Sequence, residues 1–234
     1  MKYKTKTPNR CLNIPMKNKN FDLIVFDWDG TLVDSTAHIA WSIQKAYGDA
    51  ELPIPTQEDA RHVIGLGLSD TFQYLSPSLT SEQHKIIVDR YRHHFLTADE
   101  KIQTFEYVEE GLRLLSEQEY QLAVATGKSR VGLDRALKEV SFGGYFNGTR
   151  CGDEGFPKPH PDMLLHLMTE FAAEPQRTLM IGDTTHDLEL ARNAGAQSVG
   201  VTYGAHGREK LEKLNPRLLV NEFRELIEWL KVNG

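Results

Sequence analysis

The chain has 234 residues, of which 40% are hydrophobic and 26% charged, and its formal net charge is −6. This composition suits a globular protein with an ordinary core, arranged as one domain with an insertion or as one large and one small domain. No apolar run approaches the roughly 18 residues that span a membrane, and the N-terminus lacks the apolar segment of a secretory signal, so we expect a cytoplasmic protein without a membrane partner.

The first 20 residues are basic. They hold six Lys or Arg side chains and no acid, so the net charge divides into +6 in this segment and −12 in the remainder. The segment has neither an amphipathic period nor interleaved aromatic residues, and we interpret residues 1–20 as a poorly ordered arm, with no nucleic-acid partner expected. The remainder of the chain, with its net charge of −12, does not attract an anionic substrate by its overall electric field. Any such attraction must come from a local cation and a few hydrogen-bond donors.

The apolar run Leu23–Phe26 predicts a buried strand, after which come Asp27 and Asp29. The following stretch has helical periodicity and no strand pattern. Helices are expected over residues 36–47, with Ser35 or Thr36 as the cap, and over residues 57–65, 68–75 and 81–96. We therefore predict that residues 36–100 form an inserted, all-helical cap domain.

From residue 101 onward, helical segments alternate with short apolar runs, which is the pattern of parallel βαβ units. The expected strands are residues 122–126, 145–151, 178–181, 198–201 and 218–220; the expected helices are residues 107–118, one after Ser129, one from Pro161, residues 186–193 and one from Phe223. The predicted fold class is α/β, a doubly wound, mostly parallel sheet. Its Rossmann-like core is expected to comprise residues 21–35 and 101–234.

Polar residues follow several of these strands. Asp27 and Asp29 follow the first strand, Thr126 ends the next, and Asp183 follows the strand at 178–181. Taken alone, Asp29 and Gly30 are also explained by a turn, with Asp27 as a strand-end cap. The convergence of several polar strand ends at one edge of a parallel sheet is not explained by turns, and it favours a functional site there.

The residue types at this edge suit phosphoryl transfer. Asp27, Asp29, Asp183 and Asp187 bring negative charge together, which requires a cation, and oxygen ligands favour Mg²⁺ over zinc. Lys158, in a rigid run of prolines, supplies a point charge for a phosphate oxygen or for Asp27; taken alone, it is also explained as a solvated lysine. Thr126 and Gly127 offer a hydroxyl and backbone donors before a predicted helix.

Four motifs carry a resemblance to a known family. They are Phe-Asp-Trp-Asp-Gly-Thr-Leu-Val-Asp-Ser at residues 26–35, Thr126-Gly127, Lys158-Pro159, and Gly182-Asp183 followed by Asp187. In this order they resemble the haloacid dehalogenase-like superfamily of phosphatases, in the phosphoglycolate phosphatase-like group, and the resemblance covers residues 21–232. Trp28 departs from the Leu or Phe that is commoner at that place.

The resemblance implies roles for these residues. Asp27 would be the nucleophile that forms an aspartyl-phosphate, and Asp29 would be the general acid and then the general base. Mg²⁺ would bind Asp27, the backbone carbonyl of Asp29, Asp183 and Asp187. Thr126, Gly127 and Lys158 would bind the phosphoryl group of a small-molecule phosphate ester, such as phosphoglycolate, a sugar phosphate or a mononucleotide.

Within the predicted cap, the stretch Arg61–Ser69 resembles the specificity loop of the family. Gly65 would let the backbone approach the site, and Arg61 would meet a second anionic group of the substrate. A turn between helices that needs glycine explains the stretch equally well. His186 is interpreted as a helix-start residue rather than a metal ligand.

Two other functions remain open at this point. A phosphosugar mutase of the same superfamily keeps both Asp27 and Asp29, and release of free phosphate separates it from a phosphatase. A phosphorylatable receiver-type signalling domain also uses a strand-end Asp, a Thr, a Lys and Mg²⁺, but it is about half as long and has no inserted cap. A monomer and a homodimer are both compatible with the sequence.

Overall fold

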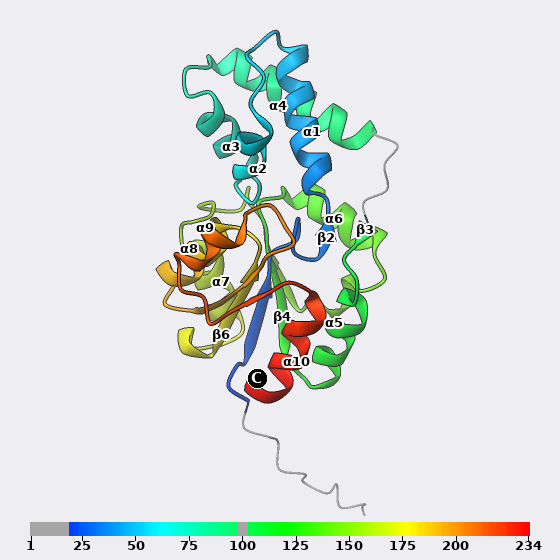
Figure 1. Ribbon diagram of the computed structural model, residues 1–234, viewed down its shortest axis with the longest axis vertical. Coiled ribbons are helices and arrows are strands. Elements are labelled where there is room, and N and C mark those ends of the chain that lie inside the picture. Colours follow the sequence, from blue (N-terminus) through cyan, green and yellow to red (C-terminus); the bar gives the residue numbers. More distant parts are fainter. Residues whose placement is uncertain (1–18, 98–102) are drawn as a thin grey trace, which may run out of the picture.

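The computed structural model describes residues 19–97 and 103–234, so residues 1–18 of the predicted arm lie outside the described residues. Within these ranges the central sheet is parallel, with the strand order β5-β4-β1-β6-β7-β8. Its strands are β1 Leu23–Phe26, β4 Gln121–Ala125, β5 Gly148–Arg150, β6 Thr178–Gly182, β7 Gln197–Val201 and β8 Leu218–Val220. Helices cover both faces of the sheet (Figure 1), which confirms the predicted doubly wound α/β class.

Strand β1 lies in the middle of the sheet and positions the candidate site. Phe26, its last residue, is level with Val124 of β4 on one side and Ile181 of β6 on the other. The chain runs from β1 outward to β4 and β5 and then returns to β6, so the strand order reverses between β1 and β6. Ligands of open α/β sheets bind at such a switch point, beyond the carboxyl ends of the strands.

Alternate residues of β1 enter the two layers of the core, because successive side chains of a strand point to opposite faces. Ile24 and Phe26 pack in a cluster with α5 Val108–Glu117, α6 Arg130–Glu139 and α10 Phe223–Asn233. Leu23 and Val25 pack on the other face, against α7 Asp162–Glu170 and α8 Thr185–Asn193. Burial on both faces explains why β1 is an uninterrupted apolar run.

Four helices, which we call the cap helices, lie together beyond the carboxyl ends of the strands (Figure 1). They are α1 Thr36–Asp49, α2 Gln57–His62, α3 Leu68–Leu75 and α4 Ser81–Thr97. They share a hydrophobic cluster of their own, which includes Ile43, Tyr47, Phe72 and Ile87. The division of the chain into a core and a cap domain, with boundaries at residues 36 and 100, stays a prediction.

Some local features differ from the sequence-based expectation, and the strand expected at residues 145–151 is confined to residues 148–150. Helix α2 ends at His62, not near residue 65, and Gly65 lies in a turn with φ +94°, a conformation that favours glycine. Strands β2 Val33–Asp34 and β3 Gln103–Thr104 pair antiparallel, next to the two segments that join the cap helices to the core. Helix α9 Arg208–Glu212 was also not predicted.

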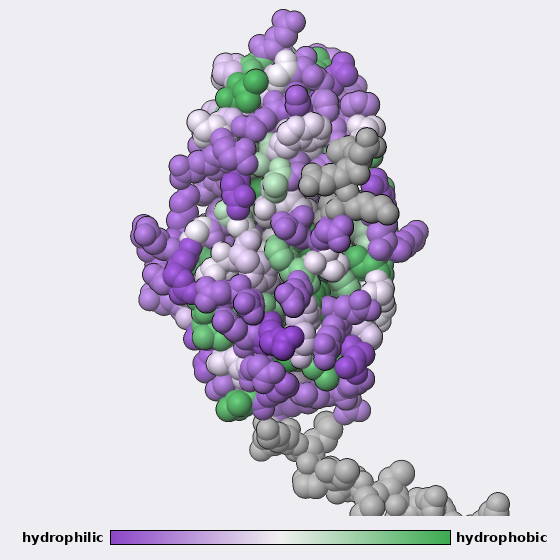
Figure 2. All heavy atoms as spheres, turned by 45° about the vertical axis from the view of Figure 1, so that its right-hand side comes forward, coloured by the Kyte–Doolittle hydropathy of each residue, from purple (hydrophilic) through white to green (hydrophobic). Residues whose placement is uncertain are grey.

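On the face shown in Figure 2, hydrophobic residues occur in small groups between hydrophilic ones. None of the helices in the described part of the chain combines the length and the apolar character needed to cross a bilayer.

Candidate active site

Asp27 and Lys158 form the centre of the site. Asp27 follows β1 and Lys158 lies before α7, and each is only 1% exposed. The Lys158 Nζ lies 2.8 Å from Asp27 Oδ1 and 2.6 Å from Asp187 Oδ1, so one ammonium group contacts two carboxylates. The Asp27 Oδ2 is buried and has no hydrogen-bond partner among the described residues. A buried carboxylate oxygen without a donor is unfavourable unless a ligand or an ion completes it.

Asp183 and Asp187 are held in place by the segment that follows β6. Asp183 accepts hydrogen bonds from the Thr31 hydroxyl, at 2.8 Å, and from the Ala205 backbone N–H, at 2.7 Å. Asp187 lies in the first turn of α8 and forms a capping box with Thr184, whose backbone N–H donates to Asp187 Oδ2 at 3.0 Å. These bonds fix both side chains beside Asp27.

The crowding of carboxylates changes their acidity. Burial raises the pKa of Asp27 well above its usual value, and the charges of Asp187 and Asp183 add to this effect. Burial, followed by the charge of Asp187, raises the pKa of Asp183 to about 7. Burial alone would lower the pKa of Lys158, but the carboxylates of Asp187 and Asp27 raise it above its usual value. The site therefore needs positive charge, and Lys158 supplies part of it.

The donor set fits a hard divalent cation. One carboxylate oxygen from each of Asp27, Asp183 and Asp187 lies within 4.8 Å of the others. Oxygen-only ligands suit Mg²⁺ rather than zinc. The Asp27 Oδ2, which has no hydrogen-bond partner among the described residues, offers one ligand atom. Two glycines border this space: a Cβ on Gly30 or on Gly204 would lie 2.2 Å from Asp183 Oδ2. These residues therefore fit the predicted magnesium site, although the Asp29 side chain does not belong to the cluster.

The Asp29 carboxylate lies beside the cluster and has its own partners. Asp29 is followed directly by the turn at Gly30, whose φ is +82°. Asp29 Oδ1 accepts a hydrogen bond of 2.6 Å from the Ser35 hydroxyl and lies 3.0 Å from Lys128 Nζ. Ser35 occupies the N-cap position of α1, but its side chain makes no cap bond. Ser35 is thus the N-cap residue, as expected, but its hydroxyl bonds Asp29 and not the helix backbone.

Lys128 is a site residue that sequence reasoning missed. Its ammonium group contacts Asp29 and also lies 4.7 Å from the centre of the Phe95 ring, which belongs to cap helix α4. A cation over an aromatic face is favourable, so Lys128 links a cap helix to the carboxylate of Asp29. The signal was present in the sequence, because Lys128 directly follows the Thr126-Gly127 pair that was expected to bind an anion.

The Thr126-Gly127 pair lies under the loop that follows α2. Thr126 is 1% exposed, and its hydroxyl accepts a hydrogen bond of 3.2 Å from the Lys128 backbone N–H. A Cβ on Gly127 would lie 2.3 Å from the carbonyl oxygen of Leu66 and 2.7 Å from that of Gly65. Gly65 in turn approaches Thr184, whose hydroxyl would lie 3.2 Å from an added Cβ. The loop at Gly65 thus contacts two of the four motif segments, and its role in binding a substrate stays a prediction.

Gly127→Ala is expected to separate this loop from the core, because the added methyl group would clash with two backbone oxygens. We expect kcat/KM to fall by roughly tenfold or more and the Tm to fall as well, because backbone atoms must move to admit the methyl group. Steady-state kinetics and a thermal melt check this. Gly144→Ala is the matched control, because no atom lies within 4 Å of a Cβ built there. Unchanged kinetics in Gly127→Ala would contradict the need for close contact.

Arg61 and His62, at the end of α2, bind the core. The Arg61 guanidinium donates to the carbonyl oxygens of Gly204, at 2.7 Å, and Ala205, at 3.4 Å. In this structure Arg61 therefore contacts core backbone, and its predicted contact with a second substrate anion stays a prediction. The His62 carbonyl is bonded by the rings of His186 and His206. Burial lowers the pKa of His206 to about 4 and also lowers those of His62 and His186.

Comparison with known proteins agrees with the geometry. The model of the haloacid dehalogenase-like hydrolase family matches residues 24–201. "Probable phosphatase IndB" of Dickeya dadantii is 36% identical over 88% of this chain and 91% of its own length, and a phosphoglycolate phosphatase of Mannheimia succiniciproducens is 31% identical over 90% and 99%. The crystal structure of a "predicted phosphoglycolate phosphatase" from Haemophilus somnus superposes with a TM-score of 0.79 at 27% identity, covering 91% of this chain and 99% of that one. The chain therefore belongs to the haloacid dehalogenase-like hydrolase family.

Proposed function

We propose that the protein is a Mg²⁺-dependent phosphatase that hydrolyses a small phosphate monoester through a phosphorylated Asp27. The observation that carries the proposal is the state of Asp27, a fully buried strand-end carboxylate with one oxygen beside Lys158 and the other without a partner among the described residues. Phosphatases among the relatives support the class of reaction. Phosphoglycolate, sugar phosphates and mononucleotides are the proposed substrates, and the cytoplasm is the proposed location.

In the proposed reaction each of these residues has a separate role. Asp27 attacks phosphorus, and Lys158 and Thr126 bind the phosphoryl oxygens, on which charge accumulates. Asp29 donates a proton to the leaving oxygen and then accepts one from the water that hydrolyses the acyl phosphate. Asp27, Asp183, Asp187 and the carbonyl of Asp29 would hold Mg²⁺, which when bound neutralises charge on the phosphoryl group and the carboxylates.

The test is phosphate release from a panel of small phosphate esters, with and without Mg²⁺. We expect Mg²⁺-dependent release of inorganic phosphate from at least one ester, and none in the presence of EDTA. Conversion of a sugar phosphate to an isomer without phosphate release would instead identify a mutase. A stable phosphoprotein that releases no phosphate would identify a receiver-type signalling domain.

Asp29→Asn is expected to separate the two chemical steps. With an aryl phosphate, whose leaving group needs little protonation, Asp27 can still be phosphorylated, but water is no longer activated, so the phosphoenzyme accumulates. Intact-protein mass spectrometry after rapid quenching measures the phosphorylated fraction. Asp34→Asn, at an exposed position in the same segment, is the control. Absence of the phosphoenzyme, with unchanged turnover, would remove Asp29 from its proposed role.

The contribution of Asp183 to the stability of the metal-free protein is expected to fall as pH rises. The pKa of Asp183 is about 7 in the folded state against an ordinary 3.8, so the folded state binds more protons than the unfolded state between these values. Stability from this group is therefore lost as pH rises through that interval, and Mg²⁺, which needs the ionised form, should restore it. The increase in Tm on adding Mg²⁺ should be larger near pH 7.5 than near pH 5. In Asp183→Asn this difference should shrink, and an equal increase at both pH values in the wild type would contradict the assignment.

A further inference from the structure

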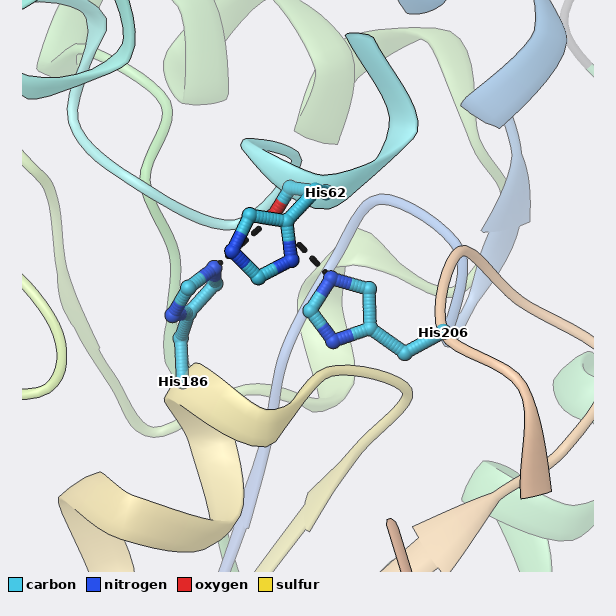
Figure 3. Close-up of side chains that lie close together, drawn as sticks. All are labelled: His62, His186 and His206. Carbon is cyan, nitrogen blue, oxygen red and sulfur yellow. Dashed lines mark hydrogen bonds between the residues drawn. The ribbon is translucent and has the colours of Figure 1, made fainter. Parts of the chain in front are cut away.

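A second cluster of possible metal ligands lies between the cap helices and the core (Figure 3). His62 is the last residue of α2, His186 lies in the first turn of α8, and His206 lies in the segment between β7 and α9. One ring nitrogen from each lies within 4.8 Å of the others. His186 and His206 are buried, at 9% and 2% exposure, and His62 is half-buried. None of these residues belongs to the acidic cluster.

Two of the nitrogens already converge on one point. The Nε2 atoms of His186 and His206 lie 2.9 Å and 3.0 Å from the carbonyl oxygen of His62, as the dashed lines in Figure 3 show. The Nδ1 of His62 is buried and has no hydrogen-bond partner among the described residues. A buried ring nitrogen without a hydrogen-bond partner is unfavourable, so the cluster is incomplete as it stands. A ligand that accepts this lone pair would complete it.

The hydrogen bonds of His206 determine which of its ring nitrogens carries the proton. His206 Nδ1 accepts a hydrogen bond of 3.0 Å from the Thr185 backbone N–H, so the single ring proton of His206 lies on Nε2. Coordination through Nε2 would move this proton to Nδ1, so the Thr185 backbone N–H would lose its acceptor and the Thr185 hydroxyl, at 3.3 Å, would accept from Nδ1 instead. The nitrogens would also move together, because tetrahedral Zn–N bonds of about 2.0–2.1 Å place nitrogens about 3.3 Å apart.

We propose that His62, His186 and His206 bind one divalent ion of the zinc class between the cap helices and the core. Three imidazoles favour Zn²⁺, Co²⁺, Ni²⁺ or Cu²⁺, whereas the carboxylates of the catalytic centre favour Mg²⁺. Three protein ligands leave a fourth position for water or for the His62 carbonyl. Because His62 comes from a cap helix and the other two ligands from the core, a bound ion adds coordinate bonds across the interface. Zinc therefore stabilises the closed arrangement seen here.

The test is direct metal binding to untagged, metal-free protein in excess Mg²⁺, which occupies the acidic cluster. Calorimetry with Zn²⁺ should show one equivalent bound per chain, and Co²⁺ should give the visible absorption of a nitrogen-ligated, near-tetrahedral site. His62→Gln and His206→Gln should each weaken Zn²⁺ binding at least about a hundredfold. His166→Gln, on the exposed face of α7, is the matched control and should bind as the wild type does.

Asp183→Asn distinguishes this site from the catalytic one, because it damages the acidic cluster and leaves the three histidines intact. Zn²⁺ binding that survives in Asp183→Asn and is lost in His62→Gln supports the proposal. Zinc should also raise the Tm of the wild type but not the Tm of His62→Gln. Circular dichroism verifies that the His62→Gln variant is folded. No binding in excess Mg²⁺, or loss of binding in Asp183→Asn alone, would overturn the proposal. These readouts do not depend on the proposed phosphatase activity.

Discussion

Asp27→Asn is expected to lower kcat by more than about a thousandfold, because the amide has nearly the same shape as the carboxylate but cannot attack phosphorus. The fold should remain intact. Burial and the charges of Asp187 and Asp183 raise the pKa of Asp27, so the ionised carboxylate is unfavourable in the metal-free protein. Removing it relieves that repulsion, while Lys158 keeps Asp187 as a partner at 2.6 Å.

Phosphate release and thermal melts in EDTA measure the two effects of this substitution. We expect the Tm of Asp27→Asn in EDTA to equal or exceed that of the wild type. Asp89→Asn, at an exposed position on α4, is the matched control for an Asp-to-Asn change. Turnover within tenfold of the wild type would exclude Asp27 as the nucleophile.

Lys158→Met is expected to damage both activity and stability. The lysine is fully buried between two carboxylates, and removing one partner of a buried ion pair costs about 3–5 kcal/mol, because the other charges are left uncompensated. Turnover should fall as well, since the phosphoryl oxygens lose their cation. Chemical denaturation in EDTA measures the free energy of unfolding of the variant.

The double variant Asp27→Asn with Lys158→Met tests the reason for this loss. If uncompensated charge causes it, the double variant should be more stable than Lys158→Met alone, because one carboxylate has also been removed. Lys210→Met removes an exposed pair with Glu58 and is expected to change stability by less than about 1 kcal/mol. A loss for Lys158→Met no larger than this control would show that the buried pair does not hold the site together.

The sequence predicted the elements whose signals are local. Helix α3 was predicted with its observed bounds, and Ser129 caps α6 as expected, with its hydroxyl accepting from the Gly132 N–H at 3.2 Å. The strand ends that carry Asp27 and Asp183 were also predicted, because a buried central strand is a continuous apolar run with a polar end.

The missed features depend on contacts between residues far apart in the chain. Strands β2 and β3 have two residues each and are strands only because they pair with each other. In the sequence, the four cap helices lie between them. The Lys128 contact with Phe95 and the contacts of the His62 carbonyl join separate segments in the same way. Local periodicity cannot indicate such pairs. His186 was therefore interpreted only as a helix-start residue, and its contact with the His62 carbonyl was not predicted.

The bond between Ser35 and Asp29 has a consequence for the order of events in a catalytic cycle. Ser35 is the last residue before α1, so a rotation of α1 away from the sheet would displace the hydroxyl that holds the carboxylate of Asp29, the proposed general acid. Phe95 of α4 would leave Lys128 in the same movement. An open molecule would thus lose the orientation of Asp29 at the moment when bulk water enters. In the proposed mechanism, the acyl phosphate on Asp27 would then be hydrolysed only while the cap helices hold the position seen here, so the position of α1 would control proton transfer through Asp29.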